Sequence, residues 1–259
     1  MISTDIIERA IDLVIERDNF LRCLKDGDRI DNYTVRPDGL VDVVGDVDIS
    51  SMRLKEIPVK FGVVTGYSNC SFNHLTSLIG CPEEVGGNFY CSHNQLTSLE
   101  GCPEEVGGTF SCSHNQLTSL IGCPEKVGGS FVCSENQLTS LEGCPEEVGV
   151  YFTCSHNHLI SLEGCPEEVG GSFYCSNNQL TSLRGCPKEV NGNFSCNNNQ
   201  LTTLRGCPEE VEDDFYCGGN PVEFTKEDIK LAKQGNAPLG LPLSFVLMKK
   251  GEEEFGKRK

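Results

Sequence analysis

The stretch CSHNQLTSLEGCPEEVGGTF, from Cys91 to Phe110, decides the fold, because Cys112 begins nearly the same wording again. Two series of cysteines advance in steps of 21 residues, one from Cys70 to Cys217 and the other from Cys81 to Cys207. The consensus that joins them is F-x-C-S-x-N-x-L-x-x-L-x-G-C-P-x-x-V. Self-similarity at one short period is typical of repeat architectures.

A unit of 21 residues is too short for two helices and their turns, and it fits one coil of a solenoid. Phe110 and Cys112 alternate with Ser111, which predicts a short strand with two inward side chains and one outward side chain. The pair Gly107-Gly108 permits the bend that leads into this strand. The rest of the coil is expected to be an irregular return.

An asparagine follows each predicted strand, where the chain must turn. We predict that its side-chain amide bonds the unpaired backbone of the turn and of the neighbouring coils. This asparagine ladder consists of Asn73, Asn94, Asn115, Asn136, Asn157, Asn178, Asn199 and Asn220.

The segment F-x-C-x-x-N-x-L-x-x-L resembles the leucine-rich repeat signature L-x-L-x-x-N-x-L, with Phe and Cys in two apolar positions. The wording LTSLEGCPEEVGG is similar to repeat proteins encoded by large bacteriophages and related viruses. The resemblance covers residues 37–221. It implies an α/β fold: a leucine-rich repeat solenoid with a parallel sheet of short strands, an irregular convex return and helical caps at both ends.

Four regions follow from this pattern. We expect an N-terminal helical cap in residues 1–36, a lead-in module with a degenerate first coil in 37–66, and the array of 21-residue coils in 67–221. A C-terminal helical cap and a flexible tail are expected in 222–259. The caps are predicted as a helix over residues 5–24 that covers the first coil, and a short helix over 226–234 with Thr225 as its N-cap. The apolar stripe of the first helix is Ile6, Ala10, Val14, Leu21 and Leu24.

The 16 cysteines permit three interpretations. A disulfide framework is typical of small secreted chains, and no apolar signal segment precedes this one. A zinc cluster needs closely spaced ligands, and C-x-x-C does not occur. The third interpretation is that cysteine serves as a small buried hydrophobic residue, and this one we favour.

Composition excludes several classes of function. The formal net charge of −17 opposes direct nucleic-acid binding, which needs clustered Lys and Arg. No run of about 18 apolar residues predicts a membrane span. No P-loop, dinucleotide fingerprint, H-E-x-x-H or nucleophile with its base is present, so we expect no catalytic residues, no metal site and no cofactor. A cytoplasmic location is expected, which is the host cytoplasm if the chain is viral.

The sequence therefore predicts a scaffold that binds another protein, of unknown identity, through the concave strand face. Outward positions there are uncharged and rich in Ser, Asn, Tyr and His, a mixture suited to adaptable recognition. The residues expected to bind are Tyr67, Tyr90, His93, His114, Glu135, Tyr151, His156, Tyr174 and Tyr216. The phage-like wording implies action on host or defence machinery.

Two alternatives remain open. From Cys81 to Asp214 the chain has 19 acidic and 4 basic residues, mostly in the Pro-Glu-Glu segments expected on the convex return. That face either keeps the array soluble or imitates a nucleic-acid backbone and docks a basic partner. The other alternative is a structural virion component.

Overall fold

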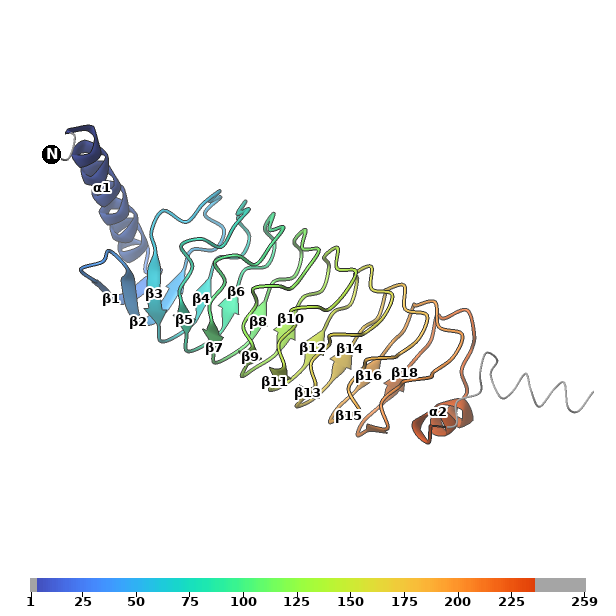
Figure 1. The fold of residues 1–259 in the computed structure, drawn as a ribbon. Helices are drawn as coiled ribbons and strands as arrows, with labels where there is room; N and C mark the ends of the chain where they lie inside the picture. Colours follow the sequence, from blue (N-terminus) through green and yellow to red (C-terminus); the bar gives the residue numbers. More distant parts are fainter. Residues whose placement is uncertain (1–3, 236–259) are drawn as a thin grey trace, which may run out of the picture.

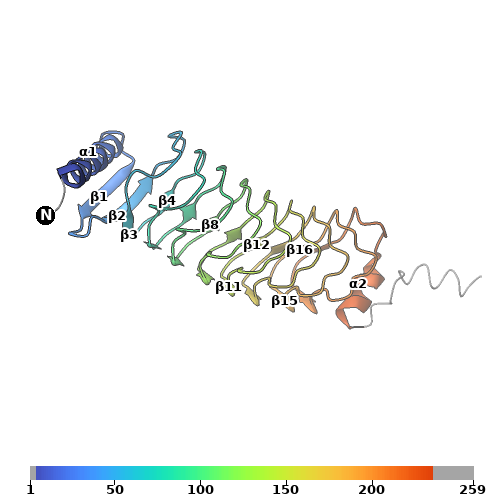
Figure 2. The ribbon, with the colours of Figure 1, turned by 45° about the horizontal axis from the view of Figure 1, so that its top comes forward.

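Coils stacked along one axis run from a helix at the N-terminal end to a helix at the C-terminal end (Figures 1 and 2). This computed structural model describes residues 4–235. The elements outside the repeats are α1 (Thr4–Asp26), β1 (Ile30–Val35), β2 (Val41–Asp48), β3 (Phe61–Val64) and α2 (Lys226–Lys233).

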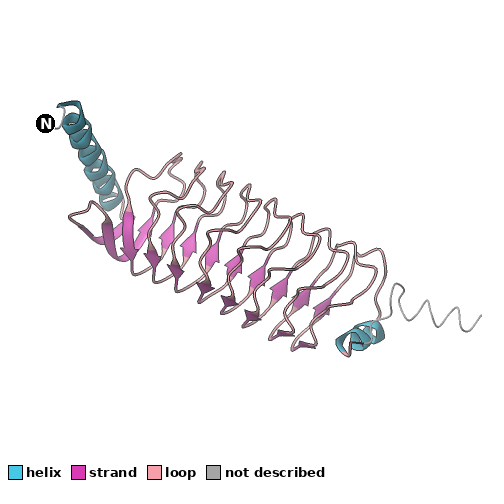
Figure 3. Ribbon diagram, viewed as in Figure 1, coloured by secondary structure: helices cyan, strands magenta, loops and turns pink. Residues whose placement is uncertain are grey.

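Each coil of the array contributes two strands of two residues, and these form two parallel ladders (Figure 3). The Phe ladder consists of β4 (Ser68–Asn69), β6 (Phe89–Tyr90), β8 (Phe110–Ser111), β10 (Phe131–Val132), β12 (Phe152–Thr153), β14 (Phe173–Tyr174), β16 (Phe194–Ser195) and β18 (Phe215–Tyr216). The Glu–Val ladder consists of β5 (Glu84–Val85), β7 (Glu105–Val106), β9 (Lys126–Val127), β11 (Glu147–Val148), β13 (Glu168–Val169), β15 (Glu189–Val190) and β17 (Glu210–Val211).

The predicted solenoid with a parallel sheet of short strands is thus confirmed, but the return is not wholly irregular. The Glu–Val ladder runs through it, with a break in the hydrogen bonding between β13 and β15. The long strand β2 joins the two ladders, because its first residues pair with β3 and its last residues pair with β4. Glycines form the corner between the ladders because neighbouring coils approach closely there. A Cβ on Gly107 would lie 2.3 Å from the carbonyl oxygen of Gly86 in the preceding coil.

The core is made of identical side chains stacked from coil to coil. The Phe rings from Phe110 to Phe194 are completely buried, and neighbouring ring centroids lie 5.1–5.8 Å apart. The strand cysteines, both leucines of each coil and the Val of the Glu–Val ladder fill the rest of the interior. Each coil buries its apolar residues against its two neighbours, so a coil alone has no closed core.

The asparagine side chains tie each coil to the one before it. Asn115 donates from Nδ2 to the carbonyl oxygen of Cys112 in its own coil and to that of Cys91 in the preceding coil, both at 3.0 Å. Its Oδ1 accepts from the backbone N–H of Leu96, also at 3.0 Å. The same three contacts recur for the other members of the ladder, with Asn73 and Asn220 at its ends.

The N-terminal end differs from the expected helical cap. The predicted helix is present, and Leu21 and Leu24 of its predicted apolar stripe are buried. Val14 of the same stripe is 46 % exposed, so the stripe does not cover the first coil along its whole length. The side chains of Ile6 and Ala10 lie outside the described residues. The hairpin of β1 and β2, which the sequence reading missed, ends the sheet with an antiparallel pair.

The C-terminal helix α2 begins where the sequence predicted. Thr225 is its N-cap and accepts from the N–H of Asp228 at 3.2 Å, while the Asp228 carboxylate accepts from the Thr225 N–H at 2.8 Å. Gly235 follows with a φ of +73°, a left-handed conformation that suits glycine at a helix end. The predicted flexible tail, residues 236–259, lies outside the described residues.

The asparagine contacts predict a large cost for losing one amide in the middle of the array. Asn136→Ala leaves the buried N–H of Leu117 without a partner and removes one of the two asparagine donors from each of the carbonyls of Cys112 and Cys133. We therefore expect the free energy of unfolding to fall by about 1–3 kcal/mol. The neighbouring Gln137 is exposed, and Gln137→Ala should cost less than about 0.5 kcal/mol. Urea denaturation of both variants measures the difference. Equal losses would remove the structural role of the asparagine.

Candidate partner-binding surfaces

The tyrosines of the Phe ladder point out of the solenoid. Tyr90 and Tyr174 are the second residues of β6 and β14, where they are half-buried by neighbouring coils. Tyr216 ends β18 and is exposed, and its hydroxyl donates to the Asp214 carboxylate at 2.9 Å. Tyr67 is half-buried at the N-terminal end of the ladder, where burial raises the pKa of its hydroxyl.

One coil in the middle of the array breaks the repeat and exposes apolar side chains. Val150 stands at the corner position that is glycine in most coils, and it is 51 % exposed. Tyr151 follows and is 37 % exposed, with its ring centroid 6.3 Å from that of Tyr174 in an edge-to-face contact. We call Val150, Tyr151 and Tyr174 the tyrosine patch. It is one continuous surface because Tyr174 lies in the next coil of the same ladder.

His93, His114, Glu135 and His156 do not lie on strands, contrary to the register assumed from sequence. They occupy the turn directly after the strand, with φ between +54° and +57°. The same left-handed position holds Phe72, and further along it holds Asn177, Asn198 and Gly219. His, Asn and Gly adopt this conformation more readily than most residues, which gives a backbone reason for their recurrence. Asn, Gly and His recur at this position of the repeat, and this pattern could have predicted the turn.

The left-handed residues form a continuous row along the rim of the Phe ladder. The rings of Phe72, His93 and His114 stack nearly parallel, with centroids 4.3 Å and 4.1 Å apart. Partial burial and the neighbouring His114 lower the pKa of His93. Further along, Nδ1 of His156 lies 3.5 Å from the Glu135 carboxylate. The row is therefore aromatic at one end and carries a carboxylate in its middle.

The residues that depart from the repeat do not gather in one patch. Val150 and Tyr151 precede the strand, and Glu135 follows one in the left-handed row. His158 and Ile160 lie on the return, where Ile160 is 61 % exposed and His158 contacts Gln179 of the next coil. Among these departures, Tyr151 makes a ring contact with a residue of the next coil, Tyr174.

One acidic residue of most Pro-Glu-Glu segments lies on a strand of the return, and the other lies on the bend before it, so the segments are not wholly turns as the sequence predicted. Glu84 pairs in register with Glu105, and Glu147 pairs with both Glu168 and Lys126. Lys126 interrupts the row, and its Nζ lies 2.7 Å from a Glu147 carboxylate oxygen. That hydrogen bond and the surrounding carboxylates raise the pKa of Lys126. Like charges directly opposite one another destabilise a sheet, so this row opposes folding unless a counter-charge is present.

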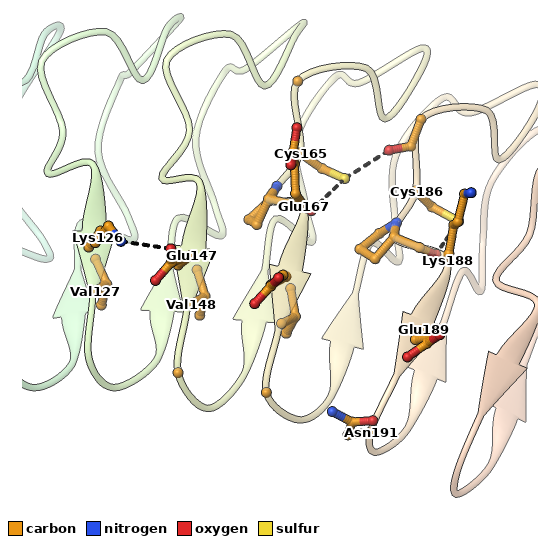
Figure 4. A pocket seen from close by; sticks show the side chains of 18 of the residues that line it. Lys126, Val127, Glu147, Val148, Cys165, Glu167, Cys186, Lys188, Glu189 and Asn191 are labelled. Carbon is orange, nitrogen blue, oxygen red and sulfur yellow. Dashed lines mark hydrogen bonds and ion pairs between the residues drawn. The ribbon is translucent and has the colours of Figure 1, made fainter.

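The Glu–Val ladder also borders an open groove of about 1170 Å³ (Figure 4). Glu147, Glu189 and Lys126 project from its strands, while Cys165 and Cys186 lie on the Cys-Pro segment that precedes them. A second hollow of about 740 Å³ has the same kind of lining two coils earlier. The acidic face is therefore grooved along the array.

The cysteines of the array are free thiols in two rows, and burial raises the pKa of most of them. The strand cysteines Cys70 to Cys217 are buried, and most of the second row is half-buried. In that row the thiols of Cys123 and Cys165 donate to glycine carbonyls of the next coil at 2.8 Å and 2.9 Å. Burial raises the pKa of each of these two thiols to about 12. Cys23 on α1 is exposed.

Two further observations concern other classes of site. Within residues 4–235, no three side chains of His, Cys, Asp or Glu are arranged to hold a metal ion. Over the same residues, no helix has the length and apolar character needed to cross a membrane.

The raised thiol pKa values predict very unequal cysteine reactivity. At pH 8 a small alkylating reagent should label about one thiol quickly, Cys23, and should reach all 16 after denaturation. At a pH of about 9.5 the array cysteines should still react slowly, because burial raises the pKa of most of their thiols. Mass spectrometry of alkylated peptides counts the sites, and Cys23→Ser is the control that should abolish the fast phase. Rapid labelling of most array cysteines in the folded chain would contradict their burial.

The like-charged Glu–Val ladder predicts a salt-dependent stability. Lys126→Glu replaces an attraction to Glu147 with repulsion from both neighbouring coils, so the melting temperature should fall at low salt. The loss should shrink as NaCl rises to about 0.5 M, because exposed charges are then screened. Lys126→Gln removes the attraction without adding a negative charge. Its melting temperature should lie between those of the wild type and Lys126→Glu. A loss that does not change with salt would point to packing instead of charge.

The similarity of this chain to known proteins is limited to its structure. No protein-family model matches it, and no curated protein sequence is significantly similar to it. Among solved structures, it is similar to YopM from Yersinia enterocolitica WA-314, with 16 % identity and a TM-score of 0.25. That match covers 69 % of this chain and 56 % of the other, so the chain spans little more than half the length of the protein it matches.

Proposed function

We propose that the chain is a scaffold that binds another protein through the Phe-ladder side of its solenoid, with the tyrosine patch as the anchor. The observation that carries this proposal is the departure at Val150 and Tyr151. Every other coil of the array places a small or polar residue at one or both of these positions, and this coil exposes two large apolar side chains beside Tyr174.

The chemistry of the patch suits a protein partner. A tyrosine offers a large, rigid contact area at a small cost in side-chain entropy, and interface hot spots are enriched in tyrosine. The outward neighbours are Val132 and Thr153, and Thr153 pairs in register with both Val132 and Tyr174. No ionised side chain competes at these strand positions. The phage-like repeat wording supports a partner in the cytoplasm of an infected bacterium, on host or defence machinery.

A second candidate is a basic partner on the Glu–Val ladder, including the role of nucleic-acid mimic. The groove and the stacked carboxylates favour it. The seven Pro-x-x-Val segments of the array carry 12 Glu and 2 Lys, a net charge of −10. With a coil spacing of about 4.8 Å, this is about one charge per 3 Å of the axis. Duplex DNA carries about one per 1.7 Å, so the mimicry would be dilute, and we rank it second.

A comparison of variants separates the two surfaces. The chain is used as bait in a bacterial extract, the captured protein is identified by mass spectrometry, and its affinity is measured by calorimetry at physiological salt. Tyr151→Ala and Tyr174→Ala should each weaken binding by about 1–3 kcal/mol. The double variant Glu146→Lys, Glu147→Lys should change it far less.

The opposite ranking, with circular dichroism showing all variants folded, would refute the tyrosine patch and favour the acidic surface. A salt series gives an independent check, because binding by the acidic surface should weaken strongly between low and moderate salt. Binding centred on the tyrosines should change little over the same range.

A further inference from the structure

The N-terminal end of the solenoid has an open sheet edge. β1 pairs with β2 and with no other strand of the described chain. The Arg36 N–H donates to the Leu40 carbonyl at 2.8 Å, which makes this a bonded pair of the hairpin. Bonded pairs alternate in antiparallel strands, so Thr34 bonds toward Asp42 while the N–H and C=O groups of Tyr33 and Val35 point away from β2.

The partners of β2 on its other side support this assignment. The Val41 N–H donates to the Lys60 carbonyl at 2.9 Å, and the Val43 carbonyl accepts from the Thr65 N–H at 3.0 Å. Val41 and Val43 are the residues opposite Val35 and Tyr33, so their backbone groups face away from β1 as the alternation requires. The edge at Tyr33–Val35 therefore offers four unpaired backbone groups.

Within residues 4–235, no strand or helix other than β2 donates to or accepts from the backbone of Tyr33–Val35, although Lys25 of α1 donates to the carbonyls of Ile30 and Asp31 just before it. Asn32 and Thr34 are exposed, and Tyr33 is 37 % exposed. At the same end of the molecule, Leu13 and Ile15 of α1 are 60 % and 52 % exposed (Figure 1). An uncovered edge strand with apolar surface nearby is a template for pairing with another strand.

The geometry of the edge is self-complementary. Two copies of β1 related by a twofold axis through Thr34 would pair Tyr33 of one with Val35 of the other, twice. Those are the residues whose backbone groups are free, so each would gain both hydrogen bonds of an antiparallel bonded pair. Thr34 would then lie opposite Thr34 of the second copy.

Charge also favours a second copy at this end and opposes it elsewhere. Residues 1–36 contain 8 acidic and 6 basic residues, a net charge of −2. The remaining residues carry the other −15 of the total of −17. Two arrays would repel each other side by side, and the end that is nearly neutral is the end with the open edge.

From these observations we infer that the chain forms a symmetric dimer through the antiparallel pairing of β1 with β1 of a second copy. The sheet would then continue across the twofold axis, and the two arrays would point away from each other. Each dimer would present two tyrosine patches, so a partner with two copies of its site would gain avidity.

The test is the mass of the chain in solution, by sedimentation velocity from about 1 to 100 μM. The wild type should approach twice 28.3 kDa as concentration rises. Thr34→Lys places like charges opposite each other at the axis and should raise the dimer dissociation constant about fivefold or more. Thr34→Glu should do the same, and an equimolar mixture of the two variants should recover a dimer that contains one copy of each.

Thr118 is exposed in the array, so Thr118→Lys and Thr118→Glu are matched controls that change the charge equally and should leave the dimer intact. A wild-type chain that stays monomeric up to 100 μM overturns the inference. A dimer that is unaffected by Thr34→Lys, or variants that fail to recover on mixing, overturns pairing at β1.

Discussion

The array depends on one interaction, the contact of an asparagine side chain with the backbone of two coils. A solenoid turn leaves carbonyl and N–H groups inside the molecule that no strand can pair. The amide is suited to this place because it carries two donors and one acceptor oxygen in one plane. With Asn115 absent, the N–H of Leu96 would be buried without a partner, and the carbonyl of Cys91 would keep only the donor from Asn94. The Phe and Leu stacks add apolar burial, but they do not satisfy those groups.

The spacing that the amides impose decides what the surface can present. Coils held this closely need glycine at the corner, as at Gly107, where the preceding backbone leaves no room for a side chain. They also need a left-handed residue after each strand, which brings Phe72, His93 and His114 into one stack. Most surface positions therefore carry the same types of residue in every coil. A distinct site arises where a coil departs from the repeat, as the one with Val150 and Tyr151 does.

The sequence predicted the elements whose causes are local. The 21-residue period, the inward Phe and Cys, and the Thr225 cap all follow from side chains close in sequence. The second ladder could not be seen, because strands of two residues show no alternation and Glu-Val reads as part of a turn. The hairpin of β1 was missed for a different reason. β1 pairs with residues that lie beyond a turn, and residues 1–36 were interpreted as a helical cap without a strand.

The coils of the stack become complete in one direction, which starts at the long strand β2. β2 belongs to both ladders as one continuous strand, whereas each coil of the array contributes a separate two-residue strand to each ladder. Each later asparagine completes the coil before it and leaves its own turn to be completed by the next. During synthesis, the last coil formed therefore always lacks the hydrogen bonds that the next asparagine supplies. The coils become complete in the order in which the ribosome synthesises them. Whole units of 21 residues can therefore be gained or lost during evolution without a change in any remaining contact except those at the new junction.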